Sequence, residues 1–382
     1  MNERYDEQLE IQFDGDIVEV HAPGIWAEVW SQVMSRRRAL ALGAAALGAS
    51  FVGASSARAK GLVGKVGAGE KIGISFSGLN EYVYNDLTGS LHVLQGTGYR
   101  LLVRQSQFDA SKQLAAIEDL LAQHISALSV LPSTVQATSN GVLKAKAAGV
   151  PCVNQFWSGK TPGDSAYIGV LETDNIIGGR LVANYIMKTV PTGGKILIVE
   201  GNVGQGYSEQ FTKGIQQHLG NKWHIADIQP GNYVRSTSIT VTQNMLTAHP
   251  DAKIIVDYAT EMGVAVAGYL KSTGRKDILH ITSDSNHEMA QWMRNGYIRA
   301  NRYLSASQTG VLTFRMLRNY LENGKKPRSF VTTQPQRMIT AKDFHPNPPP
   351  SGVVNKNLDP KDPSFGIYSY DGLLPAAKKL IS

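Results

Sequence analysis

The sequence predicts an α/β protein made of two lobes, each with a parallel β-sheet flanked by helices. Short apolar segments typical of buried strands alternate with helical segments, and this alternation runs twice along the chain. At 382 residues, the chain is long enough for two domains. Its single cysteine, Cys152, excludes an intrachain disulfide, so side-chain packing must hold the fold together.

The first run of alternating segments supplies one lobe. The segment 71–76 opens it as a buried strand, and the apolar positions of 114–121 recur at the three- and four-residue spacing of an amphipathic helix. In chain order, we expect a strand at 71–76, a helix reaching about residue 98, a strand at 99–104, a helix around 114–121, a strand at 125–131, a helix at 138–148 and a strand at 150–154.

The second run supplies the other lobe in the same order. The predicted strands are 195–200, 223–229, 252–257 and 278–283, and the predicted helices are 209–219, 238–248, 262–272 and 288–295. Ligands of open parallel sheets bind at the carboxyl ends of the strands. We therefore expect the functional residues to follow directly after the strands.

An export signal is predicted at residues 34–59, inside the chain. It has a basic start, an apolar run at 39–53 that is too short for a membrane span, and a small-residue end at 57–59. The arginines at 36–38 resemble a twin-arginine motif, but an ordinary secretory signal fits too, and both routes lead to the periplasm. Residues 1–33 are then interpreted as an upstream extension that arises from a mis-assigned start codon, with Met34 as the true start. The alternative is that they form a small acidic element.

The enzyme-like motifs in the sequence do not predict catalysis. The turn Gly201-Asn-Val-Gly204-Gln-Gly206 lacks the glycine order of a dinucleotide loop and is interpreted as a plain strand-to-helix turn. After His287-Glu288 the second histidine of a zinc-protease motif is replaced by Gln291. Cys152 is expected to be a buried apolar residue. We predict neither an enzyme, nor a metal site, nor a cofactor.

Several short motifs taken together resemble the ribose-binding type of type I periplasmic solute-binding protein. The resemblance covers 71 to about 342. Its residues are Leu79-Asn80, Ala148-Gly-Val-Pro151, Thr173-Asp174-Asn175, Gly178-Gly179, Gly201 through Gly214, Gln243-Asn244-Met245-Leu246, Ala248-His249-Pro250-Asp251, Glu261-Met262, Asp284 and Asn295-Gly296.

The resemblance implies two Rossmann-like lobes that close on a ligand, joined by three chain crossovers near 173–175, 304–307 and 327–331. Each lobe is then discontinuous in sequence. The implied division is 60–174 plus 305–329 for lobe I and 175–304 plus 330–341 for lobe II, followed by a proline-rich tail at 342–382. We interpret the tail as a packing strap across the lobes in preference to a partner motif.

The resemblance also implies which positions line the pocket. They are Glu81, Tyr84, Leu131, Phe156, Trp157, Thr173, Asn202, Phe211, Tyr233, Ala259, Asp284 and Leu304. The family's Asp-Arg pair that binds sugar hydroxyls becomes Phe156-Trp157, an arginine becomes Phe211, and asparagines become Leu131 and Ala259. The polar partners of a sugar are therefore largely lost.

This replacement favours a ligand with few hydroxyl groups. A buried unpaired hydroxyl costs about 1–3 kcal/mol, so a small pentose fits such a pocket poorly. Aromatic rings with the acids Glu81 and Asp284 suit an apolar, aromatic or cationic solute. Alternatively, the rings stack on a bulkier or deoxygenated sugar or line the hinge. Asp284 either binds the ligand or caps a helix N-terminus.

We expect a monomeric periplasmic protein that captures a small molecule and presents it to the permease of an ABC importer. A ligand-sensing protein for a chemoreceptor or sensor kinase remains the alternative. A repressor of the same fold would need an N-terminal helix-turn-helix where the export signal lies. Without residues 1–59, which hold five basic and eight acidic residues, the formal charge rises from +7 to +10. In an exported binding protein this charge does not indicate nucleic acid.

Overall fold

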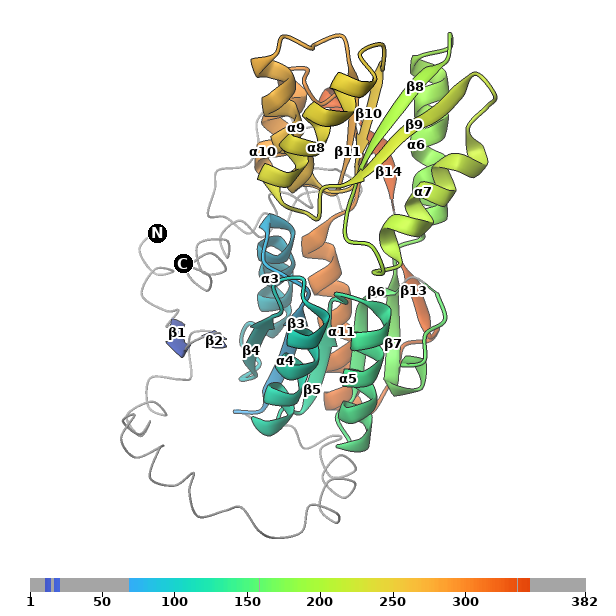
Figure 1. Cartoon of the computed structure of the whole chain (residues 1–382). Helices are drawn as coiled ribbons and strands as arrows, with labels where there is room; N and C mark the ends of the chain where they lie inside the picture. The colour runs from blue at the N-terminus through green and yellow to red at the C-terminus, as the bar shows by residue number, and fades with distance from the viewer. Residues whose placement is uncertain (1–10, 15–16, 21–68, 158, 335, 344–382) are drawn as a thin grey trace.

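The protein has two α/β lobes, one above the other in Figure 1, and this confirms the predicted fold class. The structure is a computed structural model, and it describes residues 11–14, 17–20, 69–157, 159–334 and 336–343. The predicted export signal at 34–59 and all but the first two residues of the predicted tail lie outside these ranges.

Lobe I is built on a sheet in the order β1-β2-β4-β3-β5-β6-β7-β13, whose strands from β4 to β13 are all parallel. Its strands are β1 (Ile11–Asp14), β2 (Ile17–Val20), β3 (Lys71–Phe76), β4 (Arg100–Gln105), β5 (Ala127–Val130), β6 (Cys152–Trp157), β7 (Tyr167–Glu172) and β13 (Val331–Thr333). Its helices are α3 (Glu81–Leu94), α4 (Ala110–Ala122), α5 (Val135–Ala147) and α11 (Ala306–Asn323).

Lobe II is built on a six-stranded sheet in the order β14-β12-β11-β10-β8-β9, in which only β14 is antiparallel to its neighbour. Its strands are β8 (Gly194–Glu200), β9 (Trp223–Pro230), β10 (Ile254–Asp257), β11 (Leu279–Ser283), β12 (Ala300–Tyr303) and β14 (Arg337–Ile339). Its helices are α6 (Asn175–Thr189), α7 (Tyr207–His218), α8 (Arg235–Ala248), α9 (Thr260–Ser272) and α10 (His287–Arg294).

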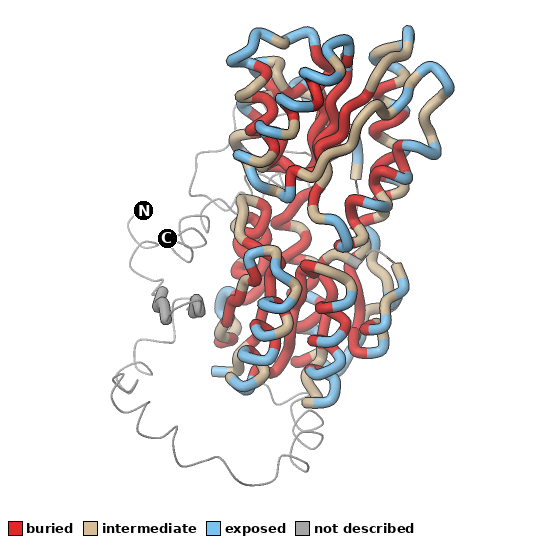
Figure 2. Tube along the Cα trace, viewed as in Figure 1, coloured by how far each residue is buried: buried red, intermediate tan, exposed pale blue. Residues whose placement is uncertain are grey.

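The central strands are buried along their whole length because helices cover both faces of each sheet. Ile72, Ile74 and Phe76 of β3 are fully buried, and so are all residues of β10. Figure 2 shows this buried interior running through the middle of both lobes. Continuous apolar strands of this kind are typical of parallel sheets, which explains why they were visible in the sequence.

Each lobe contains one pair of helices whose backbones touch at glycine. In lobe I, a Cβ on Gly89 of α3 would lie 1.9 Å from the Ser307 carbonyl oxygen of α11, and one on Gly310 would lie 2.1 Å from the Asp86 carbonyl oxygen. In lobe II, Gly179 of α6 approaches the backbone of α7 in the same way. These positions exclude any larger side chain and fix how the helices pack.

The chain crosses between the lobes three times, and we call these crossovers the hinge. Two lie where they were expected, between β7 and α6 and between β12 and α11. The third lies between Thr333 and Arg337, later than the expected 327–331, because β13 pairs with β7 and so still belongs to lobe I. The segment 330–333, predicted to be in lobe II, thus lies in lobe I.

Side-chain amides connect the three strands of the hinge. The buried Gln334 donates to the Ser305 carbonyl oxygen at 2.6 Å and accepts a hydrogen bond from Thr309. Gln336 donates to the Asp174 carbonyl oxygen at 2.6 Å. These hydrogen bonds tie the three crossovers to one another.

Strands β1 and β2 extend the edge of the lobe I sheet, with β2 antiparallel to β4. They fall within the segment 1–33 that the sequence suggested is an upstream extension. That interpretation remains a prediction.

Candidate ligand-binding cleft

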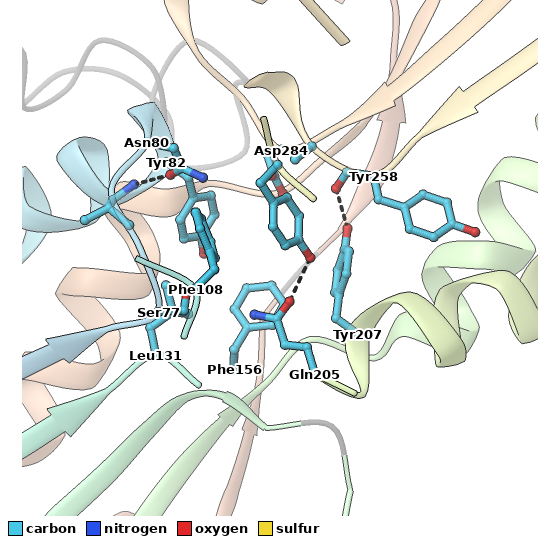
Figure 3. Close-up of a pocket in the computed structure, with 13 residues that line it drawn as sticks. Ser77, Asn80, Tyr82, Phe108, Leu131, Phe156, Gln205, Tyr207, Tyr258 and Asp284 are labelled. Atoms are coloured by element: carbon cyan, nitrogen blue, oxygen red, sulfur yellow. Dashed lines mark hydrogen bonds between the residues drawn. The ribbon is translucent and has the colours of Figure 1, made fainter. Parts of the chain in front are cut away.

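A cavity of about 50 Å³ lies between the two lobes, at the carboxyl ends of the strands. Both lobes contribute to its wall, and six of its thirteen lining residues are aromatic (Figure 3). The lining residues are Ser77, Asn80, Tyr82, Val83, Phe108, Leu131, Phe156, Gln205, Tyr207, Tyr233, Tyr258, Ala259 and Asp284.

Lobe I forms one wall from the residues that follow its strands. Asn80 caps α3, and its side-chain oxygen accepts a hydrogen bond from the Val83 N–H at 3.2 Å. This cap places Tyr82 in the first turn of the helix, where its ring meets Phe156 edge-on with centroids 6.1 Å apart. Phe108 comes from the loop between β4 and α4.

Lobe II forms the opposite wall, again from residues at strand ends. The turn after β8 supplies Gln205 and Tyr207, and the loop after β9 supplies Tyr233. A Cβ on Gly201 would lie 2.1 Å from the Tyr233 hydroxyl, so only glycine leaves room for that ring. The glycine-rich turn singled out in the sequence thus shapes the cleft.

The tyrosine hydroxyls at the cavity are bonded to the protein. Tyr207 donates to the Tyr258 carbonyl oxygen at 2.8 Å, and Tyr233 donates to the Gln205 side-chain oxygen at 2.8 Å. The hydroxyl of Tyr82 pairs with Thr309 at 2.9 Å, outside the lining. These bonds hold the rings in place and leave mainly ring surface facing the cavity.

Asp284 is the only charged residue among the described residues that line the cavity. It follows β11 directly, and its side chain is almost fully buried, with the residue 6% exposed. Burial raises the pKa of its carboxyl to about 7, while Arg302 lowers it and Asp257 raises it further. Its backbone φ of 69° is rare for a residue other than glycine and places it in the left-handed region.

Arg302 lies behind the lobe II wall and is fully buried. Its guanidinium donates to the Tyr207 hydroxyl at 3.1 Å, to Asn175 at 3.1 Å and to Gln336 at 2.8 Å. It also stacks 4.9 Å from the Phe211 ring centroid. Arg302 thereby links the cleft wall to the hinge.

A second buried polar cluster supports the loop that carries Tyr258 and Ala259. The Asp257 carboxylate contacts His280 at 2.6 Å and accepts a hydrogen bond from the Thr282 hydroxyl at 2.5 Å. All three side chains lie on neighbouring strands and are fully buried. Burial raises the pKa of Asp257, although His280 lowers it.

Several contacts join the two lobes around the cavity. Gln205 donates to the Pro132 carbonyl oxygen at 2.8 Å, and Asn286 donates to Glu81 at 2.8 Å. The rings of Phe156 and Tyr207 meet edge-on with centroids 5.4 Å apart. The structure therefore shows the two lobes in a closed arrangement.

The structure brings five of the twelve predicted pocket residues to the cavity wall. They are Leu131, Phe156, Tyr233, Ala259 and Asp284. Glu81 and Tyr84 lie on α3 beside the cleft, and Glu81 bonds to lobe II. The buried Thr173 and Leu304 lie at crossovers, where Leu304 packs into the lobe I core.

The remaining three predicted residues lie elsewhere. Phe211 is fully buried in the lobe II core, one helical turn behind Tyr207. Asn202 is half-buried in the turn after β8 and does not line the cavity. Trp157 ends β6, and its side chain is outside the described part of the structure.

Eight lining residues were missed by the sequence reasoning: Ser77, Asn80, Tyr82, Val83, Phe108, Gln205, Tyr207 and Tyr258. All eight lie in the loops or helix starts that come after predicted strands, which was the available signal, but only Ser77 and Tyr258 follow a strand directly. Phe108 follows the second strand of lobe I, a position to which the sequence comparison assigned no pocket residue.

No helix among the described residues is both long enough and apolar enough to cross a membrane. The same residues contain no group of three or more His, Cys, Asp or Glu side chains placed to hold a metal ion.

Comparison with known sequences supports the resemblance. Residues 89–326 match the model of the periplasmic binding protein domain family. The chain is 27% identical over 246 residues to the ribose import binding protein of Salmonella typhimurium, covering 64% of this chain and 82% of that protein. It is 28% identical over 276 residues to the ribose import binding protein of Bacillus subtilis, covering 71% and 87%.

Solved structures show the same fold. An ABC transporter solute binding protein from Agrobacterium vitis with bound D-fucose superposes with a TM-score of 0.69 at 19% identity, covering 78% of this chain and 100% of that one. A galactofuranose binding protein superposes with a TM-score of 0.67 at 20% identity, covering 72% and 95%. The chain belongs to the periplasmic binding protein family, a family of solute-binding proteins and not of enzymes.

Proposed function

We propose that this protein is the periplasmic solute-binding component of an ABC importer and binds one small molecule between its lobes. The observation that carries the proposal is the cavity whose wall is shared by both lobes of the family fold. Relatives named as import binding proteins support the same role.

The binding mechanism follows from the position of the cavity. A ligand that touches both walls interacts fully only with the closed arrangement, so it shifts the equilibrium between open and closed lobes toward closure. The interlobe bonds of Gln205 and Asn286 stabilise this closed arrangement. Rotation about the hinge is the motion involved. The closed surface is what a permease would recognise.

Native mass spectrometry of protein purified without refolding tests the binding role. We expect a small solute bound at one copy per chain. Folded protein that neither carries nor binds any solute in a thermal-shift screen would contradict the proposal. Uptake of the identified solute by cells with and without the gene then separates import, where uptake is lost, from sensing, where uptake persists.

A further inference from the structure

We propose that the cleft selects a small organic cation, whose ammonium head group lies among aromatic rings with Asp284 as its counter-ion. This inference rests on the solute-binding function proposed above and names the class of ligand.

The rings of the wall carry the first part of the argument. Six aromatic side chains surround the cavity, three from each lobe: Tyr82, Phe108 and Phe156, and Tyr207, Tyr233 and Tyr258. Aromatic faces have a negative electrostatic potential and attract ammonium groups within about 6 Å of the ring centroid. A cage of rings around one carboxyl matches the recognition of substituted ammonium ions.

The hydrogen-bonding groups of the cavity wall are the second line of evidence for a cation. The hydroxyls of Tyr207 and Tyr233 are bonded within the protein, as are the side-chain oxygen and nitrogen of Gln205. The side-chain oxygen of Asn80 is bonded to the helix that it caps. Ser77, Asn80 and Asp284 are the other polar lining residues. Three such residues are too few to pair all the hydroxyls of a sugar, whereas an alkylated ammonium group needs only the carboxyl.

The charges around the cavity are also negative. Neither Lys, Arg nor His occurs among the described lining residues. Helices α3, α7, α9 and α10 begin at the cleft side of their lobes, and each has a glutamate in its first turn: Glu81, Glu209, Glu261 and Glu288. Such a rim raises the local concentration of cations.

Two arginines lie near the cleft, but the net charge of the residues named around the cavity stays negative. Arg235, at the start of α8, is held by two of the rim glutamates, with contacts of 2.5 Å to Glu261 and 2.8 Å to Glu288. Arg302 lies behind Tyr207, bonded to three neutral acceptors.

The charged and titratable groups acting on Asp284 are Arg302 of β12, Asp257 of β10, and the three tyrosines Tyr82, Tyr207 and Tyr233. Burial raises the pKa of Asp284 to about 7. A bound cation favours the ionised carboxylate, so its binding would release a proton near neutral pH.

The test compares choline with 3,3-dimethylbutan-1-ol, which has the same shape but a neutral carbon in place of the nitrogen. D-ribose and D-fucose serve as the sugar probes. Isothermal titration is expected to show choline binding at least about tenfold more tightly than the neutral isostere, and more tightly than either sugar. Choline affinity should rise as pH increases from 6 to 8, as Asp284 loses its proton.

Variants show which side chains are responsible for choline binding. Asp284→Asn keeps the shape of the side chain and should reduce choline affinity by about tenfold or more. Asp251→Asn, an exposed carboxylate in the turn before β10 at the far end of the lobe II sheet, should leave it unchanged. Tyr233→Phe retains the ring and should still bind choline, whereas Tyr233→Leu should weaken binding severalfold. Circular dichroism confirms that each variant is folded.

Tighter binding of a sugar than of choline, or equal binding of choline and its neutral isostere, would overturn the cation assignment and leave the solute-binding role intact. Unchanged choline binding in Asp284→Asn would overturn the role of Asp284 as counter-ion. Folded wild-type protein that binds neither choline, nor the isostere, nor either sugar, and carries no co-purified solute, would contradict both proposals.

Discussion

Tyr233 of lobe II stacks on Phe108 of lobe I, with ring centroids 5.6 Å apart and ring planes 29° from parallel. Both residues have positive φ, 59° and 60°, which is rare for bulky side chains. Backbone in this region costs about 1–3 kcal/mol per residue and persists where the surrounding structure enforces it. The pair thus shows that both loops are shaped to bring aromatic rings together across the cleft.

Removing one ring of this stack should weaken closure. In Phe108→Ala, the closed state loses the stacking contact, worth about 0.5–1.5 kcal/mol beyond area burial, while the lobe I core stays intact. We expect a severalfold loss of ligand affinity and little change in melting temperature of the ligand-free protein. Titration calorimetry measures the affinity, and thermal unfolding measures the melting temperature. A large drop in stability with unchanged affinity would show that Phe108 acts in folding.

Gly201 should be indispensable for the site although it touches no ligand. In Gly201→Ala, the new methyl group would overlap the Tyr233 hydroxyl, displacing the ring and breaking its bond to Gln205. We expect about a tenfold or greater loss of affinity in a folded protein.

Gly268→Ala is the matched control for Gly201→Ala. Gly268 lies within α9 and has open space around its Cβ position, so alanine there should leave affinity unchanged and add up to about 1 kcal/mol of stability. If both alanine variants bind equally well, the proposed role of Gly201 is wrong.

The stability of the ligand-free protein should fall as pH rises. The Asp284 pKa is about 7 in the folded protein against an ordinary value of 3.8, so its protonated form favours the folded state. This stabilising contribution is complete below pH 3.8, declines as pH rises, and is lost above about pH 7. At about 1.4 kcal/mol per pH unit over that interval, its size is a few kcal/mol. Urea unfolding from pH 5 to 8 measures it.

In Asp284→Asn the same titration should be flatter by the contribution of this one carboxyl. An identical pH profile in the variant and the wild type would show that Asp284 does not carry the effect.

Gln334→Ala, a substitution in the hinge, should lower the free energy of unfolding. Replacing it with alanine removes two buried hydrogen bonds, one donated to the Ser305 carbonyl oxygen and one accepted from the Thr309 hydroxyl, at about 0.5–1.5 kcal/mol each. Asn323→Ala, an exposed amide at the end of α11, serves as the control and should change the unfolding free energy by less than about 0.5 kcal/mol. Denaturant unfolding compares the two, and equal effects would argue against a special role for Gln334.

The sequence allowed the strands to be predicted better than the walls of the cleft. Buried strands such as β3 and β10 are continuous apolar runs, and their helices follow a clear spacing, so the fold class could be predicted. Strand β13 is three residues long and partly exposed, and its membership of the lobe I sheet depends on pairing with β7, which no local pattern reveals.

The pocket depends on which turn of a helix faces the cleft. Tyr207 and Phe211 lie four residues apart on the same face of α7, and their rings are 5.8 Å apart. The first turn of α7 reaches the cavity and the second turn reaches the core. A prediction that is wrong by one helical turn therefore assigns Phe211 to the cavity in place of Tyr207. The resemblance assigned Asp284 to the pocket, and its position directly after a buried strand agrees with that assignment because ligands bind at the carboxyl ends of parallel strands.

Titration of the four probes into wild-type protein, Gly201→Ala and Asp284→Asn tests the central claim, that one solute binds between the lobes at the aromatic wall, most directly. We predict a single site per chain in the wild type for at least one probe, and a loss of affinity of about tenfold or more in both folded variants. A probe that binds the wild type and both variants equally well would place binding outside this cleft and contradict the account.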